Sequence, residues 1–419
     1  MAQADETEVL VVGAGPVGML TALLLAEKGV PVRIIDKEQR ATTRSYACVL
    51  HPGTLRLLDG IGLGQEALKQ GRRIETIAFY EGESRRAEMK LSQLPGKFPC
   101  AVVVPQSAFE ALLEQRLRRH SRVQLLWNHR LSDLRCERDT VLATIDKLVQ
   151  SAKGYIIREW DWSVQKTLQA RAAFVVGADG HGSMVRSRLG IEYAPLADPQ
   201  LFAVFEFESD RDPGNEVRIV MAGETANVLW PLPGKGCRWS FQLVKTREGG
   251  EFPDKEREAI WSMQTNVDQN TRDRVEKLAR IRAPWFQGNI RDFYWWAHIR
   301  LQPKLASQFC KGRALLPGDA AHQTGPVGVQ SMNAGLSEAE DVAGKLASIL
   351  HEGASLELLD NYSRDHRDRW EGLLGLKGGL RATSGINPWV KDHSARILPC
   401  IPALGEDLAH LAMQLGFDF

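Results

Sequence analysis

The chain has 419 residues, with 53 Lys and Arg against 52 Asp and Glu and a formal net charge of +1 at pH 7. This length exceeds that of one simple domain, so we expect two domains. The balanced charge provides no positive field for a polyanion, and nucleic acid is therefore not expected as a partner.

The six cysteines include no C-x-x-C pair, which is typical of a reducing compartment and indicates neither a disulfide framework nor a metal site. No apolar run is long enough to span a membrane, and no signal peptide precedes the first predicted strand. We therefore expect a cytoplasmic protein that does not insert into a membrane.

The first predicted element is a strand over residues 8–12, followed by the glycine-rich turn Gly13–Gly18 (GAGPVG). The pattern then predicts a helix over residues 16–28 and a second strand over residues 32–35, which ends at Asp36. A strand–turn–helix–strand unit with G-x-G-x-x-G in the turn is typical of a dinucleotide site.

The residues of this turn have separate physical roles in such a site. Gly13 permits the tight turn, Gly15 lets a pyrophosphate approach the backbone, and Gly18 lets helix and strand pack closely. Pro16 opens the helix whose N-terminus faces that pyrophosphate. Asp36 lies 18 residues after Gly18, where its carboxylate can accept a hydrogen bond from a ribose hydroxyl. The alternative interpretation is a glycine turn that only packs.

The next segments are mainly short strands. Residues 39–58 predict a polar connector and then a helix, and alternating strands follow over residues 74–98. An apolar strand at residues 102–105 leads to a helix that begins at Gln106. Residues 139–170 predict a hairpin or a longer β excursion.

A second turn that contains glycine and aspartate (VGADGHGS) follows a strand that begins at residue 174, and it includes Asp179. Residues 201–244 predict a meander of four strands separated by Asp, Gly and Pro turns. Residues 255–282 predict a helix, and the chain after residue 350 has the pattern of amphipathic helices.

A third turn, Gly318-Asp319, lies in the stretch Gly312–Leu346. An apolar strand precedes it, and a loop rich in glycine and proline follows it. From Met332 the apolar residues recur at helical spacing. A helix N-terminus that faces a glycine-lined loop favours an anion, but the pattern alone does not identify that anion.

The three turns, VVGAGPVG, VGADGHGS and LLPGDAAHQTGPVGVQSMNAG, occur in this order. Together they resemble the turns of the para-hydroxybenzoate hydroxylase family, the FAD-dependent group A aromatic monooxygenases, over about residues 8–350. The resemblance implies an α/β fold, α+β overall, with a Rossmann-like FAD-binding domain interleaved with a β-sheet substrate domain and followed by a C-terminal helical segment. The predicted boundaries are 1–72, 101–190 and 290–350 for the FAD-binding domain, 73–100 and 191–289 for the substrate domain, and 351–419 for the C-terminal segment.

The resemblance also implies which residues hold FAD. Asp319 would bind a ribityl hydroxyl, and the helix start at Met332-Asn333 would face the pyrimidine edge of the flavin, where N–H groups stabilise the anionic reduced ring. Pro326 would direct its carbonyl group toward the reacting edge of the substrate, so it is a catalytic candidate. The predicted cofactor-binding residues are Gly13, Gly15, Pro16, Gly18, Asp36, Arg44, Gln106, Asp179, Asp319, Ser331, Met332 and Asn333.

Two residues depart from the pattern of the family. Gly325 stands where the family often has a proline, and Ser331 stands where it usually has a glycine. Ser331 would therefore bring a hydroxyl group near the ring. His322, beside the third turn, is interpreted as stabilising that turn.

The implied reaction is hydroxylation of a phenolic or other electron-rich aromatic substrate. NADH or NADPH would reduce the flavin from a transient surface site, and a hydroperoxyflavin formed with molecular oxygen would deliver one oxygen atom to the ring. A monomer and a homodimer are both compatible with the sequence. Two alternatives stay open: epoxidation or Baeyer–Villiger insertion on a polyketide or other natural-product intermediate, and a flavoprotein without monooxygenase turnover.

Candidate substrate contacts lie in the predicted sheet domain and after the first connector. Strand alternation directs about half of the residues inward, toward an apolar pocket that accepts an aromatic ring. Tyr46 and His51 follow Arg44 near the expected flavin face and are catalytic candidates that would touch substrate or nicotinamide. The predicted substrate residues are Phe205, Arg218, Trp230, Trp239 and Tyr294, for each of which packing or a solvated position is the alternative.

Overall fold

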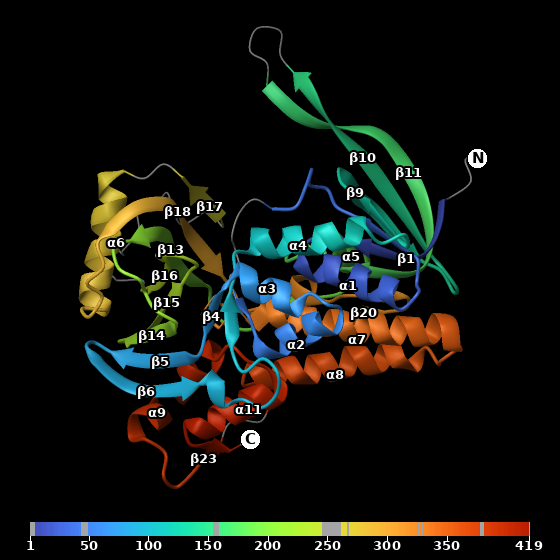
Figure 1. Ribbon diagram of the computed structural model, residues 1–419. Coiled ribbons are helices and arrows are strands. Elements are labelled where there is room, and N and C mark those ends of the chain that lie inside the picture. Colours follow the sequence, from blue (N-terminus) through green and yellow to red (C-terminus); the bar gives the residue numbers. More distant parts are fainter. Residues whose placement is uncertain are drawn as a thin grey trace.

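The computed structural model describes residues 5–42, 49–153, 159–244, 261–265, 268–325, 327–328, 330–377 and 381–418. The chain forms two large sheets and passes back and forth between them, and a group of helices lies at its C-terminal end (Figure 1). Segments that are distant in sequence therefore meet between the sheets.

The first sheet has a parallel core in the order β21-β11-β1-β2-β8. β1 pairs with β11 up to Val12↔Gly177, and β11 pairs with β21 at Val176↔Leu315. All three glycine-containing turns therefore leave the sheet at the same edge. The strands are β1 (Asp5–Val12), β2 (Val32–Ile35), β8 (Val123–Leu126), β11 (Glu159–Gly177), β20 (Cys310–Lys311) and β21 (Ala314–Leu315).

The helix after the first turn, α1 (Pro16–Glu27), is apolar on nearly all sides because other elements enclose it. It packs on β1 and β2 and contacts α4 (Gln106–Arg118) and α7 (Gln330–Glu352). The long helix after the third turn thus rests directly on the helix after the first turn. Two shorter helices follow the first connector, α2 (Pro52–Gly60) and α3 (Gly64–Gln70).

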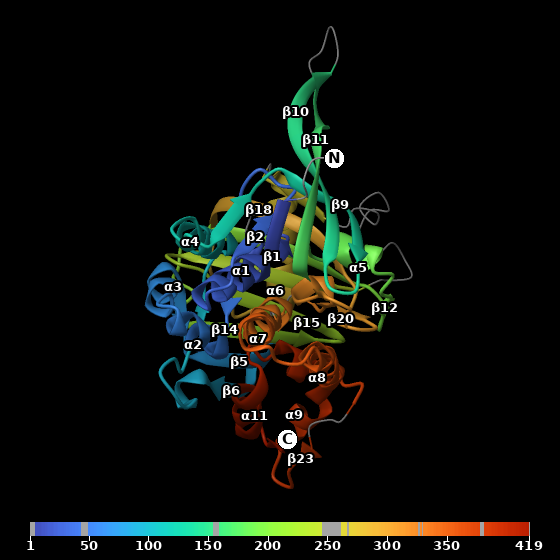
Figure 2. The ribbon, with the colours of Figure 1, turned by 90° about the vertical axis from the view of Figure 1, so that its right-hand side faces the viewer.

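A long antiparallel ribbon extends the first sheet. β10 (Val141–Lys153) pairs along its length with β11, and β9 (His129–Cys136) pairs with β10. The outer part of this ribbon projects well beyond the rest of the molecule (Figures 1 and 2). The hairpin predicted for residues 139–170 is confirmed.

The second sheet has the order β17-β18-β13-β16-β15-β14-β5-β6, and its strands are antiparallel except for the parallel pair β14–β5. The predicted meander over residues 201–244 forms its centre. The strands are β5 (Thr76–Glu81), β6 (Ser84–Lys90), β13 (Gln200–Ser209), β14 (Glu216–Ala222), β15 (Thr225–Pro231), β16 (Gly236–Leu243), β17 (Trp261–Gln264) and β18 (Ile290–Leu301).

The two faces of the second sheet have different partners because side chains alternate along each strand. Phe205, Trp239 and Phe241 pack with α6 (Gln269–Arg282) on one face. Phe202 and Trp230 lie on the opposite face, in a second apolar core that includes the C-terminal helices. The candidate site lies on this second face.

Two boundaries differ from those predicted. Residues 290–301 were assigned to the FAD-binding domain, whereas β18 pairs with both β13 and β17 and belongs to the second sheet. Trp295 and Trp296 of β18 pack in the apolar cores on the two faces of the second sheet, so the strand belongs to that sheet although the third turn follows it in sequence. Trp261–Gln264 form a strand, and the helix predicted from residue 255 begins at Gln269; residues 245–260 lie outside the described residues.

The C-terminal segment is mainly helical, as predicted. It contains α8 (Glu357–Leu373), α9 (Pro388–Asp392), α10 (Ser394–Ile397) and α11 (Gly405–Gln414), with a short pair of strands, β23 (Arg381–Ala382) and β24 (Phe417–Asp418). The remaining elements are α5 (Met184–Arg188), β3 (Val49–Leu50), β4 (Arg72–Ile74), β7 (Ala101–Val103), β12 (Tyr193–Pro195), β19 (Lys304–Ala306), β22 (His322–Gln323) and the 3-10 turns η1 (Leu91–Gln93), η3 (Gly318–Ala320) and η4 (Leu398–Cys400).

Candidate active site

The glycines of the first turn are confined by close neighbours at two positions and open at a third. Gly13 has φ +101°, and a Cβ atom there would lie 2.3 Å from the carbonyl oxygen of Ala178. A Cβ on Gly18 would lie 1.9 Å from the carbonyl oxygen of Gly13, so α1 can pack here only on glycine. At Gly15 no atom beyond its chain neighbours lies within 4 Å of the Cβ position. An anion can therefore approach the N–H groups at the start of α1, which opens with Pro16.

Asp36 lies at the end of β2, beside this turn. Its carboxylate accepts hydrogen bonds from the N–H groups of Ala14 at 2.6 Å and Glu38 at 2.8 Å. The carboxylate therefore faces the first turn, where a ribose would follow the pyrophosphate.

Gln106 is joined to the connector by Glu110, a residue that the sequence motifs did not indicate. Gln106 donates a hydrogen bond to one carboxylate oxygen of Glu110, and the N–H of Thr42 donates to the other, each at 2.8 Å. Burial raises the pKa of Glu110 to about 7, although these two bonds lower it. The only sequence signal was one acid among the apolar positions of α4. The contact of Gln106 with FAD stays a prediction.

The carboxylate of Asp179 is engaged within its own turn. It accepts hydrogen bonds from the hydroxyl of Ser183 at 2.5 Å and from the N–H groups of Met184 at 2.7 Å and Val185 at 3.1 Å. These groups begin α5, whose N-cap residue is Ser183, so Asp179 ties the second turn to the start of the helix. Its side chain supports the shape of the second turn, and direct contact with a cofactor stays untested.

Arg186 connects the second turn to the third, and the motifs did not single it out. Its guanidinium donates to the carbonyl oxygens of Ala320 at 2.7 Å and His181 at 2.8 Å, and it stacks 3.9 Å from the ring centre of Tyr193. The two turns are consequently held as one unit.

Asp319 lies in η3, at the edge shared by the three turns. No hydrogen-bond donor among the described residues reaches its carboxylate, and burial raises its pKa while the charges of His322 and His181 lower it. Its oxygens are therefore available to a hydroxyl group of a bound molecule. Gly318, which precedes it at φ +69°, contacts Gly335 of α7 so closely that a Cβ on Gly335 would lie 2.8 Å from its Cα.

Ser331 closes the loop that follows the third turn. Its Oγ accepts a hydrogen bond from the N–H of Thr324 at 3.0 Å and lies 3.2 Å from the hydroxyl of Thr324. The hydroxyl that was expected near the ring is thus engaged within the loop. Met332 is half-buried and packs on the core of the first domain.

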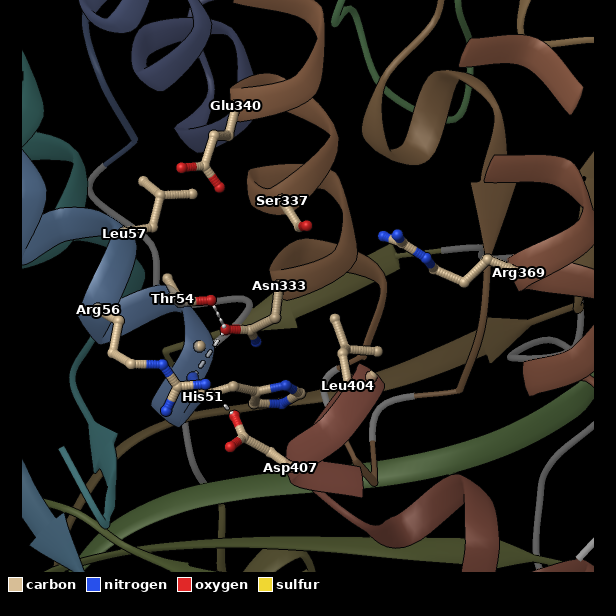
Figure 3. Close-up of a pocket in the computed structure, with 12 residues that line it drawn as sticks. His51, Thr54, Arg56, Leu57, Asn333, Ser337, Glu340, Arg369, Leu404 and Asp407 are labelled. Carbon is tan, nitrogen blue, oxygen red and sulfur yellow. Dashed lines mark hydrogen bonds and ion pairs between the residues drawn. The ribbon is translucent and has the colours of Figure 1, made fainter. Parts of the chain in front are cut away.

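Asn333 joins the start of α7 to the segment around β3 and α2. Its Oδ1 accepts hydrogen bonds from the N–H of His51 and the hydroxyl of Thr54, each at 2.8 Å, and its amide donates to the carbonyl of Val49 at 2.9 Å. Figure 3 shows Asn333 directed toward Thr54 and His51. Its side chain therefore ties the start of α7 to the segment around β3 and α2.

His51 supports the loop and does not line the apolar cavity described below. The ring is 1% exposed, and its Nε2 donates to the carbonyl of Gly328 at 3.0 Å. Burial lowers its pKa to about 3, against a smaller opposing effect of this bond, so the ring is neutral at pH 7. His51 borders a polar surface pocket of about 430 Å³ between α2, α7, α8 and α11, in which Arg56 pairs with Asp407 at 2.6 Å (Figure 3). This position does not favour an acid–base role.

Three predicted residues, Arg44, Tyr46 and Pro326, lie outside the described residues. Their predicted contacts stay predictions.

An apolar cavity of about 540 Å³ lies between the second sheet, the loop after the third turn and the C-terminal segment. Phe202 and Ala226 line it from the sheet, and Gly325 and Val327 line it from the loop. The remaining lining residues are Leu196, Ala197, Gln200, Glu224, Gln242, Pro303, Thr324, Gln330, Leu373, Leu374, Gly375, Leu376, Ala395, Arg396, Leu398, Pro399 and Cys400.

The five predicted substrate residues do not line this cavity. Phe205 and Trp239 face α6 on the other side of the sheet, and Trp230 is buried in the core beside the cavity. Arg218 pairs with Glu216 at 2.9 Å, and Tyr294 is 45% exposed. Phe202 was missed because alternation identifies two sets of residues in a strand but does not say which set faces the site.

The departure at Gly325 has a structural counterpart on the sheet. A Cβ on Gly325 would lie 3.3 Å from the side-chain oxygen of Gln200, so this glutamine occupies space beside the loop. The C-terminal segment closes the loop from the other side, because a Cβ on Gly328 would lie 2.3 Å from the carbonyl oxygen of Pro399. Gln330 also donates to the carbonyl of Ile401 at 3.3 Å.

A family model described as an FAD binding domain matches residues 6–375. The chain belongs to this family. Its residues fit FAD: of the three glycines of the first turn, Gly15 has open space at its Cβ position, and Asp36 faces that turn. No donor in the described part of the chain reaches the carboxylate of Asp319. Among the described residues, no helix combines the length and the apolar composition needed to cross a membrane.

Relatives and solved structures agree with this assignment. The chain is 27% identical to 6-methylpretetramide 4-monooxygenase of Streptomyces rimosus, over 100% of this chain and 66% of that protein. It is 28% identical to para-nitrophenol 4-monooxygenase of Pseudomonas sp. (strain WBC-3), over 86% of this chain and 82% of that protein. The chain thus spans just under two thirds of the first of these relatives. The crystal structure of p-nitrophenol 4-monooxygenase PnpA from Pseudomonas putida DLL-E4 superposes with a TM-score of 0.72 at 22% identity, over 98% and 99% of the two chains, which shows a shared fold.

Proposed function

We propose that the protein is an FAD-dependent monooxygenase that uses NADH or NADPH and molecular oxygen to hydroxylate a phenolic or other electron-rich aromatic substrate. One observation carries this proposal: the loop that follows the third turn also forms a wall of the apolar cavity, through Thr324, Gly325 and Val327. A cofactor held by the turn and a substrate held in the cavity would then meet across this loop. The names of the phenol- and pretetramide-hydroxylating relatives support the reaction class.

Bound FAD supplies the redox chemistry and the activation of oxygen, which no amino-acid side chain provides. The residues of the chain have other tasks. Phe202 and Val327 offer apolar contacts to a ring, and the amide of Gln200, which has no hydrogen-bond partner among the described residues, can bind a substrate hydroxyl. The contact between Pro399 and Gly328 brings the C-terminal segment onto the loop and limits the access of water.

Three residues keep the roles expected from the sequence as part of this proposal. Arg44 would contact the pyrophosphate, Pro326 would present its carbonyl to the substrate, and Tyr46 would touch substrate or nicotinamide. His51 enters the proposal as a support of the loop through Gly328.

A second reaction is favoured by the size of the cavity. A volume of about 540 Å³ falls in the range of sites that hold drug-sized ligands, and a single phenol ring fills only a part of it. Epoxidation or Baeyer–Villiger insertion on a polyketide-sized molecule is therefore the alternative. A flavoprotein without monooxygenase turnover loses part of its support, because the hydroxyl of Ser331 is engaged with Thr324.

The test uses the full chain reconstituted with FAD. NADH and NADPH oxidation is measured with a panel of phenols, aromatic acids and polyketides under labelled oxygen-18, and the product mass is determined. Incorporation of one labelled atom into a ring hydroxyl supports hydroxylation, whereas a ring-expanded lactone or an epoxide supports the alternative. NAD(P)H oxidation without label in any product contradicts both.

Matched variants connect the activity to the cavity. Gln200→Leu should raise KM for a hydroxylated substrate about tenfold, since one hydrogen bond to a buried polar group is lost. Gln70→Leu, on the exposed surface of α3, is the control and should leave KM unchanged. Equal KM values in the two variants would remove the cavity from the proposal.

A further inference from the structure

A buried carboxylate lies behind the third turn, on the side that faces α7 and α8. Glu338 of α7 is 1% exposed. Its Oε2 accepts hydrogen bonds from the N–H of Gly318 and from Nε2 of His322, each at 2.8 Å, and its Oε1 accepts from the indole N–H of Trp370 at 2.9 Å. Three N–H donors therefore satisfy a carboxylate that water does not reach, and a buried charge requires such partners.

The protonation of Glu338 is consistent with these partners. Burial alone raises the pKa of Glu338, but the charge and hydrogen bond of His322, the charge of His366 and the N–H of Gly318 outweigh it, and the pKa falls to about 2. His366 links Glu338 to Asp341: its Nδ1 lies 4.0 Å from Oε1 of Glu338, and its Nε2 lies 2.9 Å from a carboxylate oxygen of Asp341.

The ring of His322 is held between two aromatic side chains. It stacks on Trp370 with ring centres 3.9 Å apart and planes inclined by 25°, and on Phe309 with centres 5.9 Å apart and planes inclined by 28°. The imidazole is completely buried. It therefore has little freedom to rotate away from Glu338.

The donors to Glu338 come from elements that are separated in the chain. Gly318 and His322 belong to the FAD-binding turn on either side of Asp319, whereas Trp370 belongs to α8. Gly335 of α7 packs on Gly318 one turn before Glu338. One carboxylate thus ties the turn to two helices.

We propose that Glu338 is a positioning residue for FAD: it fixes Gly318 and His322, and through them it holds the carboxylate of Asp319 in the place where it meets the cofactor. Glu338 does not contact the open side of the turn, so it acts only through these residues. The inference rests on FAD binding by the family and is independent of which reaction the protein catalyses.

Glutamine cannot replace this carboxylate, although it has the same shape. Both oxygens of Glu338 accept hydrogen bonds, whereas an amide offers one acceptor and one NH₂ group. In Glu338→Gln the NH₂ group faces either the donors of the turn or the indole of Trp370. In the first orientation the turn loses its acceptor. In the second the NH₂ group and the indole N–H, both donors, repel each other and displace the amide oxygen from the turn.

The test measures FAD binding to flavin-free protein, without substrate or NAD(P)H. Glu338→Gln should weaken FAD binding about tenfold or more, since a buried donor is left without an acceptor. It should also shift the midpoint potential of the bound flavin and reduce the vibronic structure of its visible absorption band. Glu340→Gln, two residues further on the exposed side of α7, is the matched control and should leave all three unchanged.

A second control separates positioning from general destabilisation. Leu278→Ala removes apolar packing between α6 and the second sheet, in a core that contains no residue of the third turn. It should lower the melting temperature without changing the dissociation constant for FAD. If Glu338→Gln lowers the melting temperature as Leu278→Ala does and leaves the dissociation constant and the midpoint potential unchanged, Glu338 is only structural and the inference is overturned.

The partner Trp370 provides a test that does not depend on the stability of one variant. In Trp370→Phe the donor to Oε1 is gone, so a glutamine at position 338 can turn its oxygen toward the turn and its NH₂ toward the phenyl ring. Glu338→Gln should therefore weaken FAD binding several-fold less in the Trp370→Phe background than in the wild type. Equal effects in both backgrounds would contradict the proposed hydrogen-bond arrangement.

Discussion

Replacement of His51 by glutamine should reduce the loss of stability of the protein at mildly acidic pH. In the folded protein the His51 ring is buried and donates a hydrogen bond to the carbonyl of Gly328 through Nε2. Within the described residues, no acceptor lies within hydrogen-bond distance of Nδ1, so a proton added there would have no partner. Burial lowers its pKa to about 3. In the unfolded chain a histidine titrates near its ordinary value of about 6.5.

The sign and size of the effect follow from these two values. Because the folded-state pKa of His51 is the lower one, the unfolded state binds more protons between about pH 6.5 and pH 3, and the free energy of unfolding falls as the pH is lowered through this range. The slope is about 1.4 kcal/mol per pH unit below pH 6.5, which amounts to about 2 kcal/mol between pH 7 and pH 5. Glutamine does not titrate, and its amide can still donate to Gly328.

The assay is denaturant unfolding of flavin-free protein at pH 7, 6 and 5, in which the difference between the wild type and His51→Gln is followed. The charged side chains around the same pocket, Arg56, Glu340, Arg369 and Asp407, are present in both proteins and cancel in this difference. His410→Gln, on the exposed side of α11, is the control and should follow the wild type. Parallel loss of stability in the wild type and His51→Gln would refute the reasoning.

Three further perturbations have defined outcomes. Asn333→Ala leaves three buried partners without their hydrogen bonds and should lower the free energy of unfolding by about 3–5 kcal/mol in calorimetry or denaturant unfolding; a change below about 1 kcal/mol contradicts this. Gly18→Ala should abolish FAD binding and destabilise the flavin-free protein, because its Cβ meets the carbonyl of Gly13. Gly15→Ala should weaken FAD binding but change the free energy of unfolding of the flavin-free protein by no more than about 0.5 kcal/mol. Fluorescence titration with FAD and melting curves distinguish the two variants. Burial raises the pKa of Glu110 to about 7 in the folded protein, so its stabilising contribution is present below about pH 4.5 and is lost as the pH rises through 7. Between pH 5 and pH 8 the free energy of unfolding of the wild type should fall by about 2 kcal/mol more than that of Glu110→Gln. Identical pH profiles of the two proteins would exclude this role.

The FAD-binding turn could be predicted from the sequence because its requirements are local. Gly13 and Gly18 lie a few residues apart, and the steric limits that demand glycine arise within one strand–turn–helix unit and its neighbouring strand. The start of α7 was predicted within two residues for the same reason, since loop and helix signals adjoin. The fold class and the interleaving of two sheets followed from the order of such local patterns.

The substrate face could not be predicted in the same way. The alternation of β13 separates Phe202 from Phe205 correctly, but both residues are large and aromatic, and nothing in the strand indicates which side faces the loop. That choice depends on α6 covering one face and on the C-terminal helices covering the other. The assignment of β18 to the first domain was wrong because a strand's partners, not its neighbours in sequence, decide its sheet.

The sequence by itself determined where this protein bends and where an anion can approach it, because turns and helix starts depend on the conformational limits of a few adjacent residues. Only the tertiary structure decided which side chains act on those turns. Glu338 reaches back to Gly318 from the next helix, and Gln200 meets Gly325 from a distant strand. Such contacts are made between segments that the chain brings together only when apolar surface is buried, and no local pattern records them.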